Sequence, residues 1–155
     1  MPPALDFLRE SLRFNQEYKE SLDRKASFLL GIASVILVLS FNNIDRPGFL
    51  VVAVGALFAS LFSIWVISFP FRRLHQGKFS LICAWGFEHL TEADYNLRLD
   101  AVLNNETAML QTFKQEIFAL SEYSIKTKLR FIKLASLALT FGLVAGFAVI
   151  IFTNI

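Results

Sequence analysis

The sequence contains a single cysteine, Cys83, so an internal disulfide is excluded. Only 18% of its 155 residues are charged, and a net charge of +2 is too small to indicate nucleic-acid binding by bulk electrostatics. Residues 26–44, 49–69 and 134–152 carry no charge at all. Proton relays and coupled transporters need ionisable groups inside such segments, so this absence argues against a transporter subunit.

Catalytic and metal-binding signatures are also missing. His75, Cys83 and His89 are separated by 8 and 6 residues and lack a fourth ligand, so they do not have metal-ligand spacing. Gly77-Lys78 lacks the earlier glycine of a phosphate loop and is not followed directly by Ser or Thr, which indicates a turn. We therefore expect no enzyme activity, no cofactor and no metal.

Long apolar stretches are what the sequence does contain. Hydrophobic residues make up 55% of the chain, including 17 Phe, which is typical of membrane proteins. About 20 residues of helix cross the ~30 Å hydrocarbon core. The sequence thus predicts an all-α membrane protein with three transmembrane helices: a helical hairpin over residues 26–70, with spans at about 26–44 and 49–69, and a third helix over 131–155.

The positive charges predict how these helices are oriented. Fourteen of the fifteen Lys and Arg residues lie in residues 1–25 or 72–133, and only Arg46 lies between the first two spans. Positive charge collects on the cytoplasmic side of a membrane. We therefore place an N-terminal helix (1–25) and a helical region (71–130) in the cytoplasm, and the C-terminus on the far side.

Both cytoplasmic regions show helical periodicity. Apolar residues at 3-4 spacing predict an amphipathic N-terminal helix that begins near Pro2-Pro3 and packs either on its own neighbours or in an interhelical seam. Thr91-Glu92-Ala93-Asp94 resembles a capping box and opens a second helix. No Pro or Gly occurs between residues 90 and 141, so this helix is expected to continue into the third span. Residues 79–87 fit either the membrane interface or a cap on the cytoplasmic helices.

The apolar stripe of the second helix is long for one short partner helix, which favours a homo-oligomer. Gly142 and Gly146 form a Gly-x-x-x-Gly pair that permits close helix packing, either between copies or within one chain.

A charged motif marks the first membrane boundary: Asp23, Arg24 and Lys25 run directly into Ala26. Residues two apart on a helix do not face each other, so Asp23 and Lys25 are not expected to pair. Two interpretations remain for the cations. Either they anchor the helix at the lipid headgroups, or Lys25 or Arg24 meets an anionic ligand or a partner helix.

The order of these features resembles the transmembrane effectors of Pycsar antiphage defence. The resemblance rests on the Asp-x-Lys-Ala motif ahead of an apolar run, on a second span, and on an aromatic stretch before a tyrosine in an amphipathic helix. The last helix then runs through basic residues into the final span. These features correspond to residues 23–30, Trp85-Gly86-Phe87, Glu92-Ala93-Asp94-Tyr95, and 115–129. One departure is Thr127-Lys128, where the family pattern leads us to expect Lys-Tyr.

The resemblance implies a multi-pass effector of the bacterial inner membrane, with a cytoplasmic N-terminus and a periplasmic C-terminus. Such an effector binds a cyclic pyrimidine mononucleotide, cUMP or cCMP, made by a partner nucleotide cyclase. It then impairs membrane integrity and causes abortive infection. A cyclic mononucleotide offers one phosphate and a flat base, which suit cations and aromatic faces. The candidate ligand-binding residues are Lys25, Arg72, Arg73, Trp85, Tyr95, Arg98 and Lys126.

An alternative function from a different class is a structural membrane adaptor that oligomerises and recruits a cytosolic partner without sensing a nucleotide. The two hypotheses differ in their response to ligand, because only the effector is switched by a cyclic nucleotide. A nucleotide cyclase gene beside this one would also favour the effector.

Overall fold

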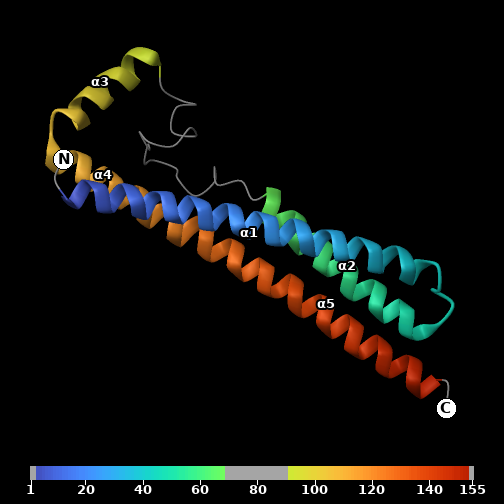
Figure 1. Cartoon of the computed structure of the whole chain (residues 1–155). Coiled ribbons are helices and arrows are strands. Elements are labelled where there is room, and N and C mark those ends of the chain that lie inside the picture. The colour runs from blue at the N-terminus through green and yellow to red at the C-terminus, as the bar shows by residue number, and fades with distance from the viewer. Residues whose placement is uncertain (1–2, 69–90, 154–155) are drawn as a thin grey trace. The chain divides into compact units, whose positions relative to one another are not determined.

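The computed structural model describes residues 3–68 and 91–153, and within these ranges all regular secondary structure is helical (Figure 1). The chain forms two compact units. One, here called the membrane unit, comprises residues 20–69 and 127–155. The other, here called the polar unit, comprises residues 1–19 and 70–126. The helices in chain order are α1 (Pro3–Phe41), α2 (Pro47–Ser68), α3 (Glu92–Leu103), α4 (Glu106–Ala119), the π-helical segment η3 (Leu120–Ile125) and α5 (Lys126–Thr153).

Three of the described helices are long and apolar enough to cross a membrane. They are α1, α2 and the continuous helical stretch from Glu106 to Thr153 that joins α4, η3 and α5. The predicted all-α, three-span fold is therefore confirmed. As expected, α1 starts at Pro3, whose missing N–H costs nothing in the first turn of a helix.

The turn between the first two spans begins with hydrogen bonds to the end of α1. α1 ends at Phe41, and the backbone N–H groups of residues 42–44 donate to carbonyls of its last turn. The Asn43 side chain also donates to the Leu39 carbonyl, at 3.0 Å. These bonds satisfy carbonyls that a helix end otherwise leaves open. Pro47 then opens α2.

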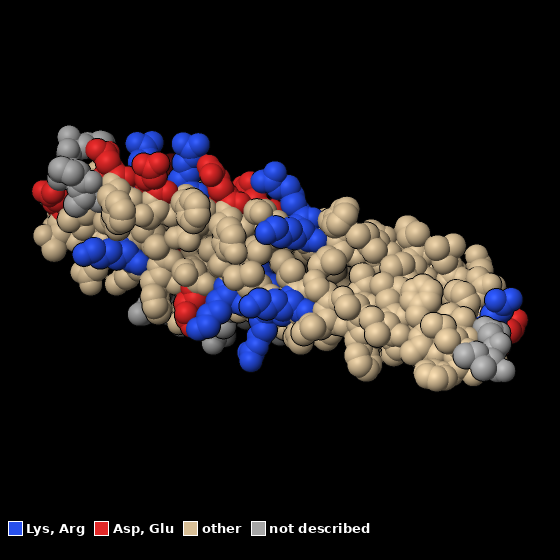
Figure 2. All heavy atoms as spheres, turned by 60° about the horizontal axis from the view of Figure 1, so that its bottom comes forward, with Lys and Arg blue, Asp and Glu red and all other residues tan. Residues whose placement is uncertain are grey.

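The core of the membrane unit is made of small side chains from three helices. Ala33 of α1, Ala56 and Ala59 of α2, and Leu139 of α5 form one buried cluster. Small residues let helix backbones approach closely, which matters in lipid because dispersion contacts drive helix association there. On the face shown in Figure 2, the surface of the membrane unit between its charged ends carries no Lys, Arg, Asp or Glu.

The two glycines of the Gly-x-x-x-Gly pair lie against α2 of the same chain. A Cβ on Gly142 would lie 2.7 Å from the Gly55 Cα, and a Cβ on Gly146 would lie 2.8 Å from the Gly48 carbonyl oxygen and would also collide with Val52. Real Cβ atoms essentially never come so close to a neighbour. Of the two interpretations left open for this pair, the structure supports packing within one chain.

The polar unit departs from the sequence prediction at one point, because the helix expected to run unbroken from residue 92 is interrupted at Asn104-Asn105. The Asn105 side chain accepts a hydrogen bond from the Ala108 N–H at 3.2 Å and caps α4. The absence of Pro and Gly did not reveal this break, because Asn competes with the helix by bonding to nearby backbone. From Glu106 onward the helix does continue into the third span.

The predicted cap of α3 is present in a modified form. The Thr91 hydroxyl oxygen accepts from the Asp94 N–H at 3.2 Å, as in a capping box. The Asp94 carboxylate accepts a hydrogen bond from the Thr91 hydroxyl, at 2.7 Å. The predicted segment at residues 79–87 lies outside the described residues.

Candidate functional site

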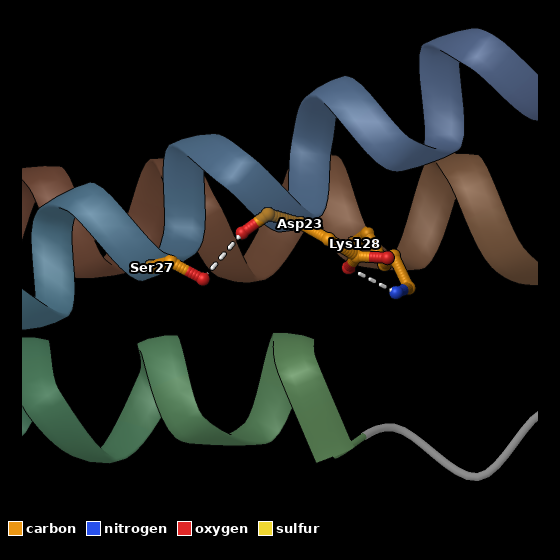
Figure 3. Close-up of polar contacts among 3 residues, drawn as sticks. All are labelled: Asp23, Ser27 and Lys128. Atoms are coloured by element: carbon orange, nitrogen blue, oxygen red, sulfur yellow. Dashed lines mark hydrogen bonds and ion pairs between the residues drawn. The ribbon is translucent and has the colours of Figure 1, made fainter.

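An ion pair joins two helices of the membrane unit where the charged segments of the chain give way to apolar ones. The Lys128 Nζ of α5 donates to the Asp23 carboxylate of α1 (Figure 3). The partners are 105 residues apart in sequence. The side chain of Lys128 is only 5% exposed and that of Asp23 is 34% exposed. The pair therefore lies at the edge of the helix interface, with Asp23 on the solvent side and Lys128 on the buried side.

Because Lys128 is buried, breaking this ion pair destabilises the protein more than breaking an exposed ion pair does. Taking an ammonium out of water costs several kcal/mol, and only a well-placed counter-ion offsets that cost. Exposed pairs such as Arg13–Glu17 in the polar unit typically contribute less than about 1 kcal/mol. Asp23 is thus the residue that makes a lysine tolerable at this position of the α1–α5 interface.

The residues of the Asp-x-Lys-Ala motif lie on two faces of α1, one buried and one exposed. Ala26 is fully buried, and Leu22 beside it is 1% exposed, so this face packs inside the membrane unit. Asp23 lies at the border of that face, and its backbone carbonyl accepts a hydrogen bond from the Ser27 hydroxyl at 3.0 Å (Figure 3). Arg24 and Lys25 are exposed. In agreement with the sequence argument, the structure pairs Asp23 with another helix and not with Lys25.

Arg24 and Lys25 line an open groove of about 590 Å³ between α1 and α5. Its other described lining residues are Ser21, Phe28 and Leu29 of α1, and Ile132 and Ser136 of α5. The groove is therefore basic at the end where the chain is charged and largely apolar where the uncharged runs begin. None of its described lining residues is acidic.

The other predicted ligand-binding residues lie elsewhere or outside the described residues. Tyr95 is half-buried on α3, and Arg98 lies one turn further along the same helix. Lys126 forms an exposed ion pair with Glu122, with 2.6 Å between Nζ and Oε1. The structure assigns Lys126 to the polar unit with α3, and Lys25 to the membrane unit. Arg72, Arg73 and Trp85 lie outside the described residues.

Lys128 is the site residue that sequence reasoning missed, because the charge pattern does not distinguish it from Lys126, Arg130 and Lys133 nearby. The buried residues of α5 are Lys128, Ala135, Leu139, Gly142 and Gly146. These follow the 3-4 spacing of a buried helix face. Extending that face toward the N-terminus of α5 from the glycines reaches Lys128. The periodicity alone could therefore have predicted that this lysine is buried. A buried lysine in turn calls for an acidic partner.

The described residues contain no group of three or more His, Cys, Asp or Glu side chains that could hold a metal ion. His75, Cys83 and His89 lie outside them.

The fold and this site together define an all-α membrane protein with three spans, in which a buried charge pair ties the first span to the third at the membrane boundary. Residues 6–154 match the Pycsar effector protein domain, PycTM, and the chain therefore belongs to the Pycsar effector family. Membership in this family supports a role as an effector in antiphage defence. No curated protein and no solved structure matches the chain.

Proposed function

We propose that this protein is the membrane effector of a Pycsar-type defence system, switched on by a cyclic pyrimidine mononucleotide. A partner cyclase makes cUMP or cCMP during infection. The effector binds it on the cytoplasmic side, impairs the integrity of the bacterial inner membrane and aborts the infection. Family membership over residues 6–154 supports the defence role, and the continuity of the helices supports the switching mechanism.

The observation that carries the mechanism is that helices of the polar unit run without a break into the membrane. Helical structure is continuous from Glu106 to Thr153, and α1 is one helix from Pro3 to Phe41. A helix transmits rotation and axial shift along its length because its backbone hydrogen bonds hold each turn to the next. A ligand that rearranges the polar helices therefore also moves the spans.

The positive-inside pattern supports a cytoplasmic N-terminus and a periplasmic C-terminus for this effector. The membrane unit has Arg24, Lys25, Arg130 and Lys133 at one boundary, whereas the turn after α1 has one acid and one base, Asp45 and Arg46. The polar unit then lies in the cytoplasm, where the nucleotide is made.

Within the polar unit, Tyr95, Arg98 and Lys126 are the binding residues that we propose among the described ones. An aromatic face suits the base, and a cation suits the cyclic phosphate. Lys126 can exchange its contact with Glu122 for one with the phosphate. This exchange costs little, because an exposed i,i+4 pair contributes only about 0.3–0.5 kcal/mol.

Activation has an energetic requirement that favours several copies acting together. Moving a two-state protein from 1:99 to 99:1 requires about 5.5 kcal/mol of preference for the active form. In a homo-oligomer that switches as a whole, each bound nucleotide supplies only part of this energy.

Exposed aromatic side chains on the polar unit support such an oligomer. Phe7 and Phe14 lie seven residues apart on α1 and are 70% and 66% exposed. Large apolar side chains that share one helix face indicate an association surface. We expect Phe7→Glu with Phe14→Glu to shift the detergent-solubilised protein to a smaller assembly by light scattering. Arg13→Gln, on the same exposed part of the helix, should leave the mass unchanged. Equal masses for all three proteins would count against self-association through this face.

Ligand-dependent thermal stabilisation of the purified full chain tests the proposed function. A ligand at 100 times its Kd stabilises by about 2.7 kcal/mol. At ~2–4 °C per kcal/mol, we expect cUMP or cCMP to raise Tm by about 5–10 °C, and cAMP and cGMP to have little effect. Lys126→Gln should reduce the shift, whereas Lys114→Gln, another exposed lysine of the polar unit, should not.

The absence of a shift with any of the four nucleotides would refute the sensing mechanism. If the protein also captured a cytosolic partner constitutively, the structural adaptor would become the better description.

A further inference from the structure

We propose that the groove between α1 and α5 binds one anionic phospholipid, with its phosphate at Arg24 and Lys25 and an acyl chain along the apolar lining. The proposal concerns the resting protein in the membrane and does not depend on nucleotide activation. Nothing in the family assignment specifies such a site.

The charges around the groove select an anion. Arg24 and Lys25 are exposed and line it, and its described lining has no acidic residue. The nearest acid in sequence, Asp23, already accepts a hydrogen bond from Lys128. The two cations at the mouth of the groove are therefore not neutralised by the carboxylate next to them. Cations near the membrane surface attract anionic lipid with an energy that corresponds to about a fivefold gain in affinity each.

The position of the groove at the start of the uncharged segments, together with its apolar lining, favours a lipid over a soluble anion. Lys25 is the last charged residue before the first uncharged run, and Lys133 is the last before the third. Beyond Lys25 the groove is lined by Phe28 and Leu29 of α1, and on α5 it is lined by Ile132 and Ser136, on either side of Lys133 in sequence. The side chain of Phe28 is 70% exposed. A ribose and a pyrimidine are polar and would lose hydrogen bonds to water against this surface. An acyl chain loses none.

The exposed side chain of Phe28 is also consistent with a bound lipid, because contact with an acyl chain removes its apolar surface from water. Apolar side chains need no burial within the protein where lipid tails surround them, because the tails are as apolar as the side chains. The groove is thus complementary to a phosphodiester headgroup at one end and to hydrocarbon at the other. Of the candidate ligand-binding residues, Lys25 is assigned by this argument to the lipid.

Lipid titration of the purified full chain, followed by native mass spectrometry, tests the proposal. The probes are dioleoyl phosphatidylglycerol and dioleoyl phosphatidylcholine, which have the same acyl chains and differ in net charge. We expect the wild-type protein to retain phosphatidylglycerol about 30-fold more tightly than phosphatidylcholine, as two near-surface cations predict. Arg24→Gln with Lys25→Gln should abolish this preference.

A matched control separates a built site from general attraction to a charged surface. Arg130→Gln with Lys133→Gln removes the same charge from the same boundary, but neither residue is in the described lining of the groove. This control should change the preference by less than about threefold, because neither side chain is in the described lining of the groove and exposed charges are weakened by salt screening. All four positions are exposed, so these variants should fold, and unchanged circular dichroism would confirm it.

A third variant tests the apolar part of the groove. Ser136→Trp fills it without changing its charge and should lower retention of both lipids about tenfold. Equal losses in the two double variants would overturn the proposal, because charge alone would then explain binding. Displacement of phosphatidylglycerol by millimolar phosphate or cUMP would overturn it in favour of a soluble ligand. A change of oligomer mass in Ser136→Trp, with lipid retention intact, would overturn it in favour of a second copy of the chain.

Discussion

Replacing Asp23 by Asn tests how much the Asp23–Lys128 pair stabilises the membrane unit. The substitution keeps the shape of the side chain and removes its charge, so the Lys128 ammonium, on a side chain that is only 5% exposed, loses its counter-ion. Removing one partner of a buried ion pair costs about 3–5 kcal/mol. Asp23 is 34% exposed, which places the expected cost at the lower end, about 3 kcal/mol. At ~2–4 °C per kcal/mol, Tm should fall by about 6–12 °C.

Thermal melting of the protein in lipid nanodiscs, followed by circular dichroism, measures this effect in a double-mutant cycle. Lys128→Met alone should cost less than Asp23→Asn, because Asp23 can turn toward solvent when its partner is gone. Asp23→Asn combined with Lys128→Met should be more stable than Asp23→Asn alone, since no unpaired charge remains buried. Arg130→Gln removes one charge at an exposed position of the same boundary, outside the described lining of the groove, and its effect should stay within about 0.5 kcal/mol.

Two results would refute this reasoning. One is a Tm loss for Asp23→Asn that is no larger than that for Arg130→Gln. The other is additivity of the two single substitutions to within about 0.5 kcal/mol, which would show that the two side chains do not interact.

Two further predictions concern helix packing and capping. Gly142→Leu should destabilise the membrane unit by about 1–3 kcal/mol or more, because a Cβ there would lie 2.7 Å from the Gly55 Cα. Gly31→Ala is the control, because no atom lies within 4 Å of its new Cβ. It should be neutral or stabilising in the same melting assay. Equal destabilisation by both would contradict close α2–α5 contact. Thr91→Ala should loosen α3 and Asn105→Ala should loosen α4 by about 1 kcal/mol each. Hydrogen exchange by mass spectrometry locates each effect, and faster exchange confined to other helices would count against these caps.

The spans were predictable from the sequence because the hydrocarbon of the membrane excludes charged side chains, and an uncharged segment can be recognised from composition alone. A spanning helix must be long and uncharged, so the uncharged residues 26–44 and 49–69 mark the first two spans without any knowledge of packing. In the structure the first of these helices ends at Phe41, and residues 42–44 belong to the turn that follows. The break at Asn104-Asn105 was not predictable by the same rule. In water an asparagine favours a helix cap but is tolerated in a helix interior at a cost below about 1 kcal/mol, so tertiary context decides between them.

The candidate site was only half predictable. The Asp-x-Lys-Ala motif drew attention to Asp23 and Ala26, but a motif on one helix does not name its partner on another. Long-range pairs depend on how helices pack, and Lys128 is distinguished from the other cations near it only by its place on the buried face of α5. The choice between chain-internal and intermolecular contacts for Gly142 and Gly146 depended on the same missing information.

The position of the Asp23–Lys128 ion pair gives it a structural role at the interface between α1 and α5. The core of the membrane unit includes the apolar side chains of Ala33, Ala56 and Leu139, and their dispersion contacts do not require one specific partner. Sliding by one turn moves side chains by about 5.4 Å, which would separate Lys128 from Asp23 and leave a buried charge unpaired. The pair therefore fixes the axial register of α1 against α5. Any activating rearrangement must either move these two helices together at the boundary or supply the cost of breaking this contact.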